Sequence, residues 1–202
     1  MRTHRLPIVV ISTALLSGAA FAQELPRVIP HISGTQPFHG TLAATAVNKD
    51  DFSFTGTPPF NGMSGALRAS ATIAGDSTHG HYTAQGLFEA IYTNPYPVCT
   101  QPGGGGGIQS VYKAFVLAMS FRETHDQLFL ALSSGTDCFN PIAGVSTGQV
   151  TFKVIGGTGR FEGATGTVVN PYKALGLAAS ALGPNGFFNA VTGTFDGFIT
   201  LK

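Results

Sequence analysis

Tryptophan is absent from this chain of 202 residues, and charged side chains make up only 10 % of it. Soluble domains carry about 25 % charged residues, so this surface must be polar mainly through hydroxyl groups. Eleven Lys and Arg against ten Asp and Glu leave a formal net charge of +1, which is not the basic balance of a nucleic-acid-binding protein. A chain with many strands and few charges is expected to close its sheet edges or to oligomerise.

The N-terminal apolar run is short. It extends from Leu6 to Leu16, whereas a helix needs about 20 residues to span a bilayer. Basic residues precede the run and Ala20-Phe21-Ala22 follows it, which is the arrangement of a secretory signal peptide cleaved after Ala22. We therefore predict a secreted or periplasmic protein without a membrane span.

Cysteine is scarce, since the chain holds only Cys99 and Cys138. No C-x-x-C motif is present, so a redox-active pair of that kind is not indicated. An even number of cysteines in an exported chain favours a disulfide. Two buried free thiols are the alternative.

Alternation of apolar and polar residues is the main structural signal. Leu67, Ala69, Ala71 and Ile73 alternate with polar or small residues, which is typical of a half-buried strand. Similar patterns, separated by turn residues, predict an all-β antiparallel barrel or sandwich of about eight strands. The expected strands are 39–47, 51–57, 65–73, 79–92, 111–121, 127–133, 150–154, 165–169 and 187–201.

Three segments interrupt this pattern. Residues 94–107 include five consecutive glycines, Gly103 to Gly107, and form either a flexible surface loop or a lid over a barrel mouth. Gly135 to Gly144 is expected to be a second long loop. Pro171 to Pro184 is rich in Ala and Leu and could form a short helix or an irregular excursion.

The stretch from Gly148 to Asn170 carries a family resemblance. Gly156-Gly157-Thr158-Gly159-Arg160-Phe161, with Gly163 and Gly166 after it, resembles the segment that joins two late strands in the allene oxide cyclase and dirigent-like β-barrel superfamily. The final strand, with Thr192 to Gly197, fits the same pattern. The resemblance implies a single calycin-like, eight-stranded antiparallel barrel, often trimeric, with an apolar cavity. The expected organisation is a signal peptide over residues 1–22, a flexible leader over 23–37 and the barrel domain over 38–202.

The glycine-rich motif is interpreted as structural. Glycine allows positive φ or close backbone approach, and Phe161 is expected to plug the barrel end. Arg160 is expected to cap carbonyl groups or to pair with a carboxylate. Because Glu162 and a strand follow, the G-x-G-x-x-G pattern of a nucleotide site is disfavoured.

Candidate site residues are few. Glu89 and Arg68 are the charges that could face the barrel interior, where a buried carboxylate could act as an acid or a base. The outward orientation is the alternative, because strand register decides the face. Tyr82, Tyr92 and Tyr112 could line a cavity with polar tips, or they could simply pack in the core.

Two further motifs have simple alternatives. Ser146 lies in a G-x-S-x-G pattern, but a nucleophile elbow needs a strand before the serine and a helix after it. His79 and His81 could begin a metal site. Such a site would need a third ligand, for which Glu89, His39 and His125 are the candidates. Plain surface histidines are the simpler interpretation, and no metal or cofactor is expected.

The sequence thus predicts an exported barrel that binds a small apolar ligand or serves structurally. A cofactor-independent cyclase, isomerase or dirigent-like protein, which steers a reactive intermediate inside the barrel, is the alternative. Such catalysis works by confinement and orientation. An ionisable group that points into the cavity would favour the enzyme.

Overall fold

The chain divides into two units, Met1–Pro30 and His31–Lys202. The computed structural model describes residues 33–48, 65–93, 97–178 and 188–202, all within the second unit. Among these residues, no helix is long and apolar enough to cross a membrane. The elements are β1 (Gly34–Asn48), β2 (Gly65–Ser77), β3 (Gly80–Tyr92), β4 (Val98–Thr100), β5 (Gly106–Phe121), β6 (Gln127–Asn140), β7 (Val145–Gly157), the short 3-10 helix η1 (Gly159–Phe161), β8 (Thr165–Ala178) and β9 (Phe188–Leu201).

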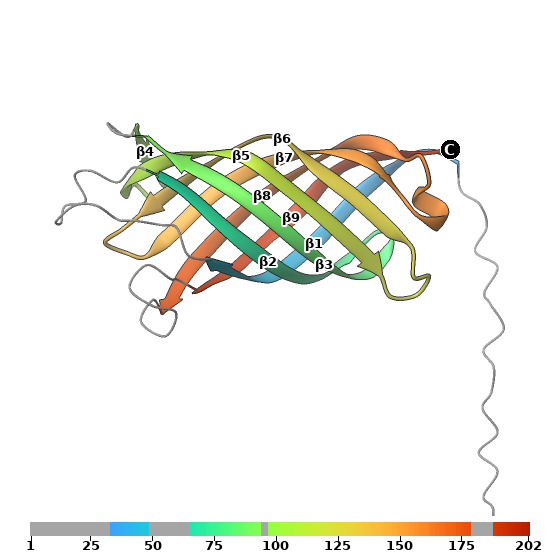
Figure 1. Ribbon diagram of the computed structural model, residues 1–202, viewed down its shortest axis with the longest axis horizontal. Coiled ribbons are helices and arrows are strands. Elements are labelled where there is room, and N and C mark those ends of the chain that lie inside the picture. The colour runs from blue at the N-terminus through green and yellow to red at the C-terminus, as the bar shows by residue number, and fades with distance from the viewer. Residues whose placement is uncertain (1–32, 49–64, 94–96, 179–187) are drawn as a thin grey trace, which may run out of the picture. The chain divides into compact units, whose positions relative to one another are not determined.

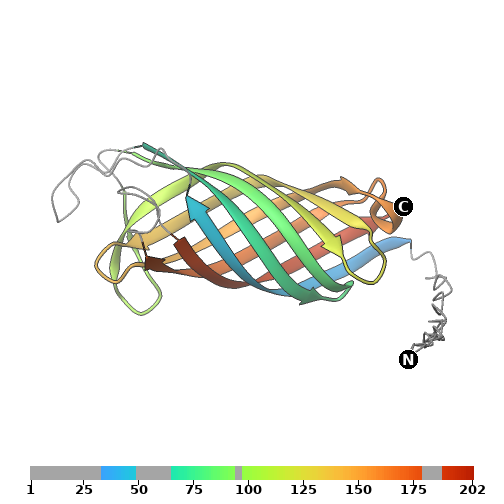
Figure 2. The same cartoon turned by 60° about the horizontal axis from the view of Figure 1, so that its bottom comes forward.

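The strands form one antiparallel sheet that closes on itself (Figures 1 and 2). Their order is β3-β2-β1-β9-β8-β7-β6-β5-β4, and an additional pairing of β3 with β5 closes the barrel. Eight long strands make the wall, while the three-residue β4 extends the sheet beyond it. The predicted all-β, eight-stranded antiparallel barrel is therefore confirmed. Closure leaves few open strand edges, which fits the scarcity of charged residues.

The two ends of the barrel differ in their connections. At one end, called the turn end, the described strands are joined by Thr78–His79, Arg122–Asp126 and Thr158–Ala164. The opposite end, called the loop end, carries the turns at Gln101–Gly105 and Pro141–Gly144. This polarity matters because the barrel interior is packed differently at the two ends.

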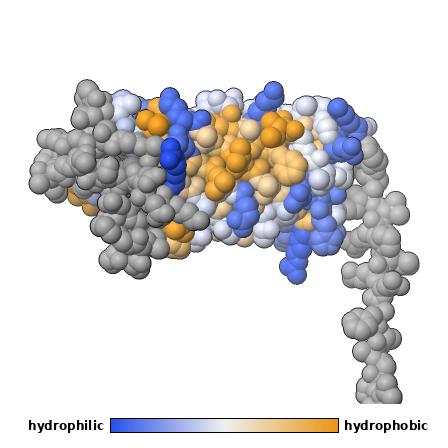
Figure 3. Space-filling model, viewed as in Figure 1, coloured by the Kyte–Doolittle hydropathy of each residue, from blue (hydrophilic) through white to orange (hydrophobic). Residues whose placement is uncertain are grey.

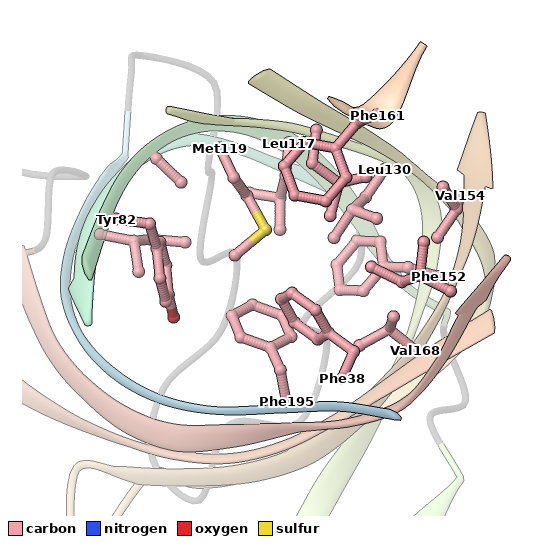
Figure 4. Packing of buried hydrophobic residues seen from close by; sticks show 14 of the residues in the cluster. Phe38, Tyr82, Leu117, Met119, Leu130, Phe152, Val154, Phe161, Val168 and Phe195 are labelled. Atoms are coloured by element: carbon pink, nitrogen blue, oxygen red, sulfur yellow. The ribbon is translucent and has the colours of Figure 1, made fainter. Parts of the chain in front are cut away.

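Aromatic side chains pack at the turn end, and Figure 4 shows two of them, Phe38 and Phe161, among the buried side chains inside the barrel. The rings of Phe121 and Phe161 lie 4.9 Å apart, and Phe38 stacks on His79 at 5.7 Å. Interior side chains here, namely Phe38, Phe121, Leu128, Phe161 and Ile199, are at most 1 % exposed. Towards the loop end the interior holds the buried side chains of Leu67, Ala90, Tyr92 and Ile108 beside partly buried ones, namely Ala44, Phe88, Tyr112, Leu132, Tyr172 and Val191. The loop end therefore has partly buried side chains among its buried ones, whereas the interior side chains named at the turn end are all fully buried.

The glycine-rich motif forms the β7–β8 connection at the turn end. Gly159 has a φ of +58°, and an added Cβ there would overlap the Asp126 carboxylate. Arg160 donates from Nη2 to the His79 carbonyl at 2.7 Å, and its Nε lies 3.3 Å from Asp126 Oδ2. The guanidinium also covers the rings of Phe121 and Phe161. Arg160 therefore makes both of the contacts that its sequence position suggested.

Three boundaries differ from the sequence-based expectation. β1 begins at Gly34, four residues before the expected start of the barrel domain. The predicted loop over Gly135–Gly144 is wrong, because β6 continues to Asn140 and only a tight turn follows. β8 likewise continues as a strand to Ala178, where a helix or an irregular segment was expected from Pro171. In both cases the hydrogen-bonded neighbours extend a strand that lacks clear apolar alternation. The strand expected over 51–57 lies outside the described residues.

The predicted disulfide is confirmed. Cys99 in β4 is bonded to Cys138 in β6. The run expected to be a long loop or a lid is instead a short hairpin turn through Gly103 to Gly105, where Gln101 N donates to the Gly105 carbonyl, because Gly106 and Gly107 already pair with β4 in β5. The Gln101 side chain donates to the carbonyls of Cys138 and Val145 at 2.8 and 2.7 Å. The β4 hairpin is thereby fixed to the β6–β7 hairpin.

Candidate functional site at the loop end of the barrel

Two irregularities decide which side chains face the interior at the loop end. In β6, Leu128 and Leu130 point inward, and a register shift between Leu132 and Ser134 brings Asp137 to the same face. A similar shift in the β3–β5 pairing, at Glu89 and Ala90, brings Tyr112 inward. A bulge inserts one residue and exchanges the two faces of a strand beyond it. Polar residues thereby enter the barrel near its loop end.

Asp137 is the centre of a buried hydrogen-bonded network. Tyr172 donates its hydroxyl to Asp137 Oδ1 at 2.6 Å, and Ser146 donates to Oδ2 at 3.0 Å. The hydroxyls of Tyr112 and Tyr172 are 2.6 Å apart. Because the single Tyr172 proton is used towards the carboxylate, Tyr112 is the donor in this second contact. The four residues are called the Asp137 network.

Burial controls the electrostatics of this network. Asp137 is 6 % exposed, and burial raises its pKa to about 6, although the hydrogen bonds from Tyr172 and Ser146 act in the opposite direction. Burial, with the neighbouring charges, also raises the pKa of Tyr112 and of Tyr172 well above 10. A carboxyl group with a pKa near 6 changes protonation close to neutral pH and can give or accept a proton.

Gly148 makes room for the network. It precedes the inward-facing Val150 by two residues in β7, and a Cβ at this position would overlap the Tyr172 hydroxyl. A glycine inside a strand often marks such a close approach. Gly148 is therefore a positioning residue for the contact between Tyr172 and Asp137.

The tyrosines singled out from the sequence all face the interior. Tyr82 is 2 % exposed and donates to the Thr41 carbonyl at 2.8 Å. Tyr92 is 5 % exposed, and burial together with the charge of Asp137 raises its pKa. Tyr112 belongs to the Asp137 network. The structure thus brings Tyr92 and Tyr112 to the loop end, while Tyr82 packs in the main core.

The two candidate charges lie on the outer wall. Arg68 Nε is 2.7 Å from Glu89 Oε2, in a pair across β2 and β3. Their strand neighbours Leu67 and Ala90 are the buried residues. Of the two orientations that the sequence left open, the outward one is observed. The interior carboxylate is Asp137 instead.

The remaining motifs do not assemble a catalytic or metal centre. Ser146 lies within β7 and donates to Asp137, and a strand rather than a helix follows it. His79 packs between Phe38 and Phe161, whereas His81 is exposed and paired with Asp76. Within the described part of the chain, no three His, Cys, Asp or Glu residues are grouped so that they could hold a metal ion.

Sequence reasoning missed Asp137 and Tyr172. Both lie in segments expected to be irregular, so no face was assigned to either residue. The alternation of Ser146, Gly148 and Val150 could have shown Ser146 on the inner face of β7. No such signal exists for Asp137, because the shift between Leu132 and Ser134 breaks the alternation before it.

Comparison with known proteins gives little further information. No protein-family model matches the chain, and no curated protein matches it. Among solved structures, the pterocarpan synthase dirigent protein GePTS1 is similar over 85 % of this chain and 94 % of its own, with 12 % identity and a TM-score of 0.22. A similarity of this size assigns neither an activity nor any residue role.

Tyrosine titration is expected to report the burial of the interior. Of the five tyrosines, Tyr82, Tyr92, Tyr112 and Tyr172 have raised pKa values because they are buried. We expect no more than one phenol per chain to ionise at pH 10.5 in the folded protein, measured by absorbance at about 295 nm. The guanidinium-unfolded chain should titrate all five near pH 10. Two or more phenolates in the folded protein at pH 10.5 would contradict this packing.

Proposed function

We propose that this protein is an exported barrel that binds a small, largely apolar molecule at its loop end. The observation that carries the proposal is the difference between the ends. The turn end is filled by fully buried aromatic side chains, whereas at the loop end partly buried side chains such as Phe88 and Leu132 accompany the buried Asp137. A molecule that enters from the loop end would place its one polar group against the side chains of Asp137 and Tyr172.

The surroundings of the network suit such a ligand. Phe88 lies 5.7 Å from Tyr112 and 5.2 Å from Phe115, measured between ring centroids. Binding sites for small molecules combine apolar walls with a few placed polar groups. Here the aromatic rings supply the walls, and Asp137 with Tyr172 supplies an acceptor and a donor. A hydroxyl or carbonyl group on the ligand would replace part of the internal hydrogen bonding.

A cofactor-independent cyclase, isomerase or dirigent-like function is the second candidate. The observation that favours it is Asp137, an interior carboxyl group whose pKa is raised to about 6 and which is bonded to Tyr172. Below that pH Asp137 can donate a proton to a bound intermediate, and above it can accept one. The barrel would confine and orient the intermediate. The resemblance of Gly156–Gly166 to the allene oxide cyclase and dirigent-like superfamily supports this candidate.

Export and self-association belong to the same proposal. The expected signal peptide over residues 1–22 and the Cys99–Cys138 disulfide both fit an oxidising compartment.

Exposed apolar side chains on the wall, Leu87 and Val116, are direct partners across β3 and β5. Figure 3 shows apolar side chains gathered over the middle of the barrel. Native mass spectrometry of the mature protein would reveal a trimer, the state implied by the resemblance, and any retained small molecule.

The binding proposal is tested with 2-naphthol and naphthalene, which differ by one hydroxyl group. We expect the wild-type protein to bind 2-naphthol at least tenfold more tightly than naphthalene, measured by probe fluorescence. In Asp137→Asn the ratio of the two affinities should fall threefold or more, because the charged acceptor for the naphthol hydroxyl is lost. Glu89→Gln is the matched control, since Glu89 lies on the outer wall, and should behave like wild type. Failure of both probes to bind, or equal affinity for the two, would overturn the proposal.

A further inference from the structure

A second site lies on the outside of the barrel wall. A groove of about 780 Å³ crosses β5, β6, β7, β8 and β9 near the loop end, with the β4 hairpin at one side. One row of register partners runs along it, in the order Gln109, Cys138, Thr147, Lys173 and Thr192. Five neighbouring strands span about 19 Å at roughly 4.8 Å per gap. The groove is therefore elongated and runs across the strands.

Side-chain alternation places this groove outside the interior site. Lys173 lies between Tyr172 and Ala174, both of which point inward. Thr194, which also lines the groove, precedes the fully buried Phe195. Cys138 follows the inward-facing Asp137 and so faces the opposite side, where its disulfide holds the β4 hairpin. The side chains of the Asp137 network thus point away from the groove, although Asp137, Gly148 and Tyr172 also contribute atoms to its floor.

The lining exposes both apolar and polar atoms, and its acidic or basic residues are Lys173 and the largely buried Asp137. Hydroxyl groups come from Thr136, Thr147, Thr192 and Thr194, and an amide comes from Gln109. Lys173 supplies one positive charge, and in the described part of the chain no carboxylate forms an ion pair with it. Such a surface combines apolar area with several hydrogen-bonding groups and one cationic side chain for an anionic substituent.

The strand pairing argues against an extended peptide in this groove. β6, β7, β8 and β9 are hydrogen-bonded on both sides, so their backbone groups offer no open edge for an added strand. Recognition must therefore rely on side-chain hydroxyl, amide and ammonium groups. Sugar hydroxyls can form hydrogen bonds with the hydroxyl and amide side chains, and an acidic substituent can pair with the Lys173 ammonium group. We propose that this outer groove binds an acidic oligosaccharide, with its carboxylate on Lys173 and its hydroxyls on the threonines.

The test uses tetragalacturonate, with cellotetraose as the uncharged sugar and tetraglutamate as the acidic peptide. Wild-type protein should bind tetragalacturonate about tenfold more tightly than cellotetraose, measured by calorimetry. Lys173→Gln should remove that difference, whereas Lys153→Gln is the matched control. Lys153 is also exposed on the outer wall, in β7, but lies outside the groove. Thermal unfolding of each variant confirms that the fold is retained.

A second pair of variants tests the hydroxyl contacts. Thr147→Val should weaken both sugars about threefold or more, while Thr167→Val should leave them unchanged, since Thr167 is an exposed β8 residue outside the groove. Tyr112→Phe, which alters the interior network at a residue outside the groove, should not change sugar binding, and this separates the two sites. The proposal is overturned if neither sugar binds at millimolar concentration or if tetraglutamate binds as tightly as tetragalacturonate. Equal losses in Lys173→Gln and Lys153→Gln would also overturn it.

Discussion

Asp137→Asn is expected to stabilise the folded protein at pH 7 by about 3 kcal/mol. Burial raises the pKa of Asp137 from 3.8 to about 6, and one pH unit corresponds to about 1.36 kcal/mol. The unfolded chain loses this proton near pH 4, while the folded protein keeps it until about pH 6. Stability therefore falls as pH rises between these values and stays low above them. Asparagine is neutral throughout and can still accept the hydrogen bond from Tyr172.

Urea unfolding of wild type and Asp137→Asn between pH 3.5 and 8 measures this effect. The difference between the two proteins should be smallest near pH 3.5 and should reach its plateau above pH 6. Comparison at each pH cancels the contribution of His79, whose pKa is lowered by burial and by Arg160. Glu89→Gln is the control for removing a carboxylate from the outer wall. A stability difference that does not change with pH would refute the raised pKa of Asp137.

Phe161→Ala is expected to destabilise the fold by about 4 kcal/mol, within the range for large-to-small aromatic substitutions in a core. Phe161 is fully buried, its ring lies 4.9 Å from that of Phe121, and the Arg160 guanidinium is 4.8 Å from its centroid. Truncation leaves a cavity at the turn end and removes the surface on which Arg160 rests. The arginine would then lose part of the packing that holds it on the His79 carbonyl.

The same urea measurement tests the packing at Phe161. Phe198→Ala is the matched control, because Phe198 is 61 % exposed on β9 and should cost less than about 1 kcal/mol. Phe161→Leu should have an intermediate effect, since leucine refills part of the space. If Phe161→Ala costs no more than Phe198→Ala, Phe161 does not plug the turn end.

Much of the barrel could be predicted from alternation. Leu67 to Ile73 and Tyr82 to Ala90 keep one apolar face along their strands, and the structure buries those faces. The glycines around Arg160 and Phe161 indicated a tight connection, which is η1 with its flanking turns. These features are local, because side-chain period and turn conformation are properties of short segments.

The candidate site could be predicted only in part. Tyr112 and Tyr92 are expected as possible lining residues, and both side chains point into the barrel interior near the loop end. Glu89 and Arg68 depended on which face of the strand was buried, and they pair outside. Asp137 was assigned to a loop, because Gly135, Thr136 and Asp137 show no apolar alternation. A strand whose inner face is polar cannot be distinguished from a loop by hydrophobic pattern.

The sequence by itself determined the strand-rich pattern, the single disulfide that two cysteines can form and the glycine-rich turn before β8. Each depends on the residues of one segment or on a simple count. Only the tertiary structure decided that Asp137, Ser146, Tyr172 and Tyr112 meet inside the barrel. Their faces depend on register shifts in β6 and between β3 and β5, and a shift of one residue exchanges inside and outside. Register is set by the neighbouring strands, which lie far away in the sequence, so no local pattern contains it.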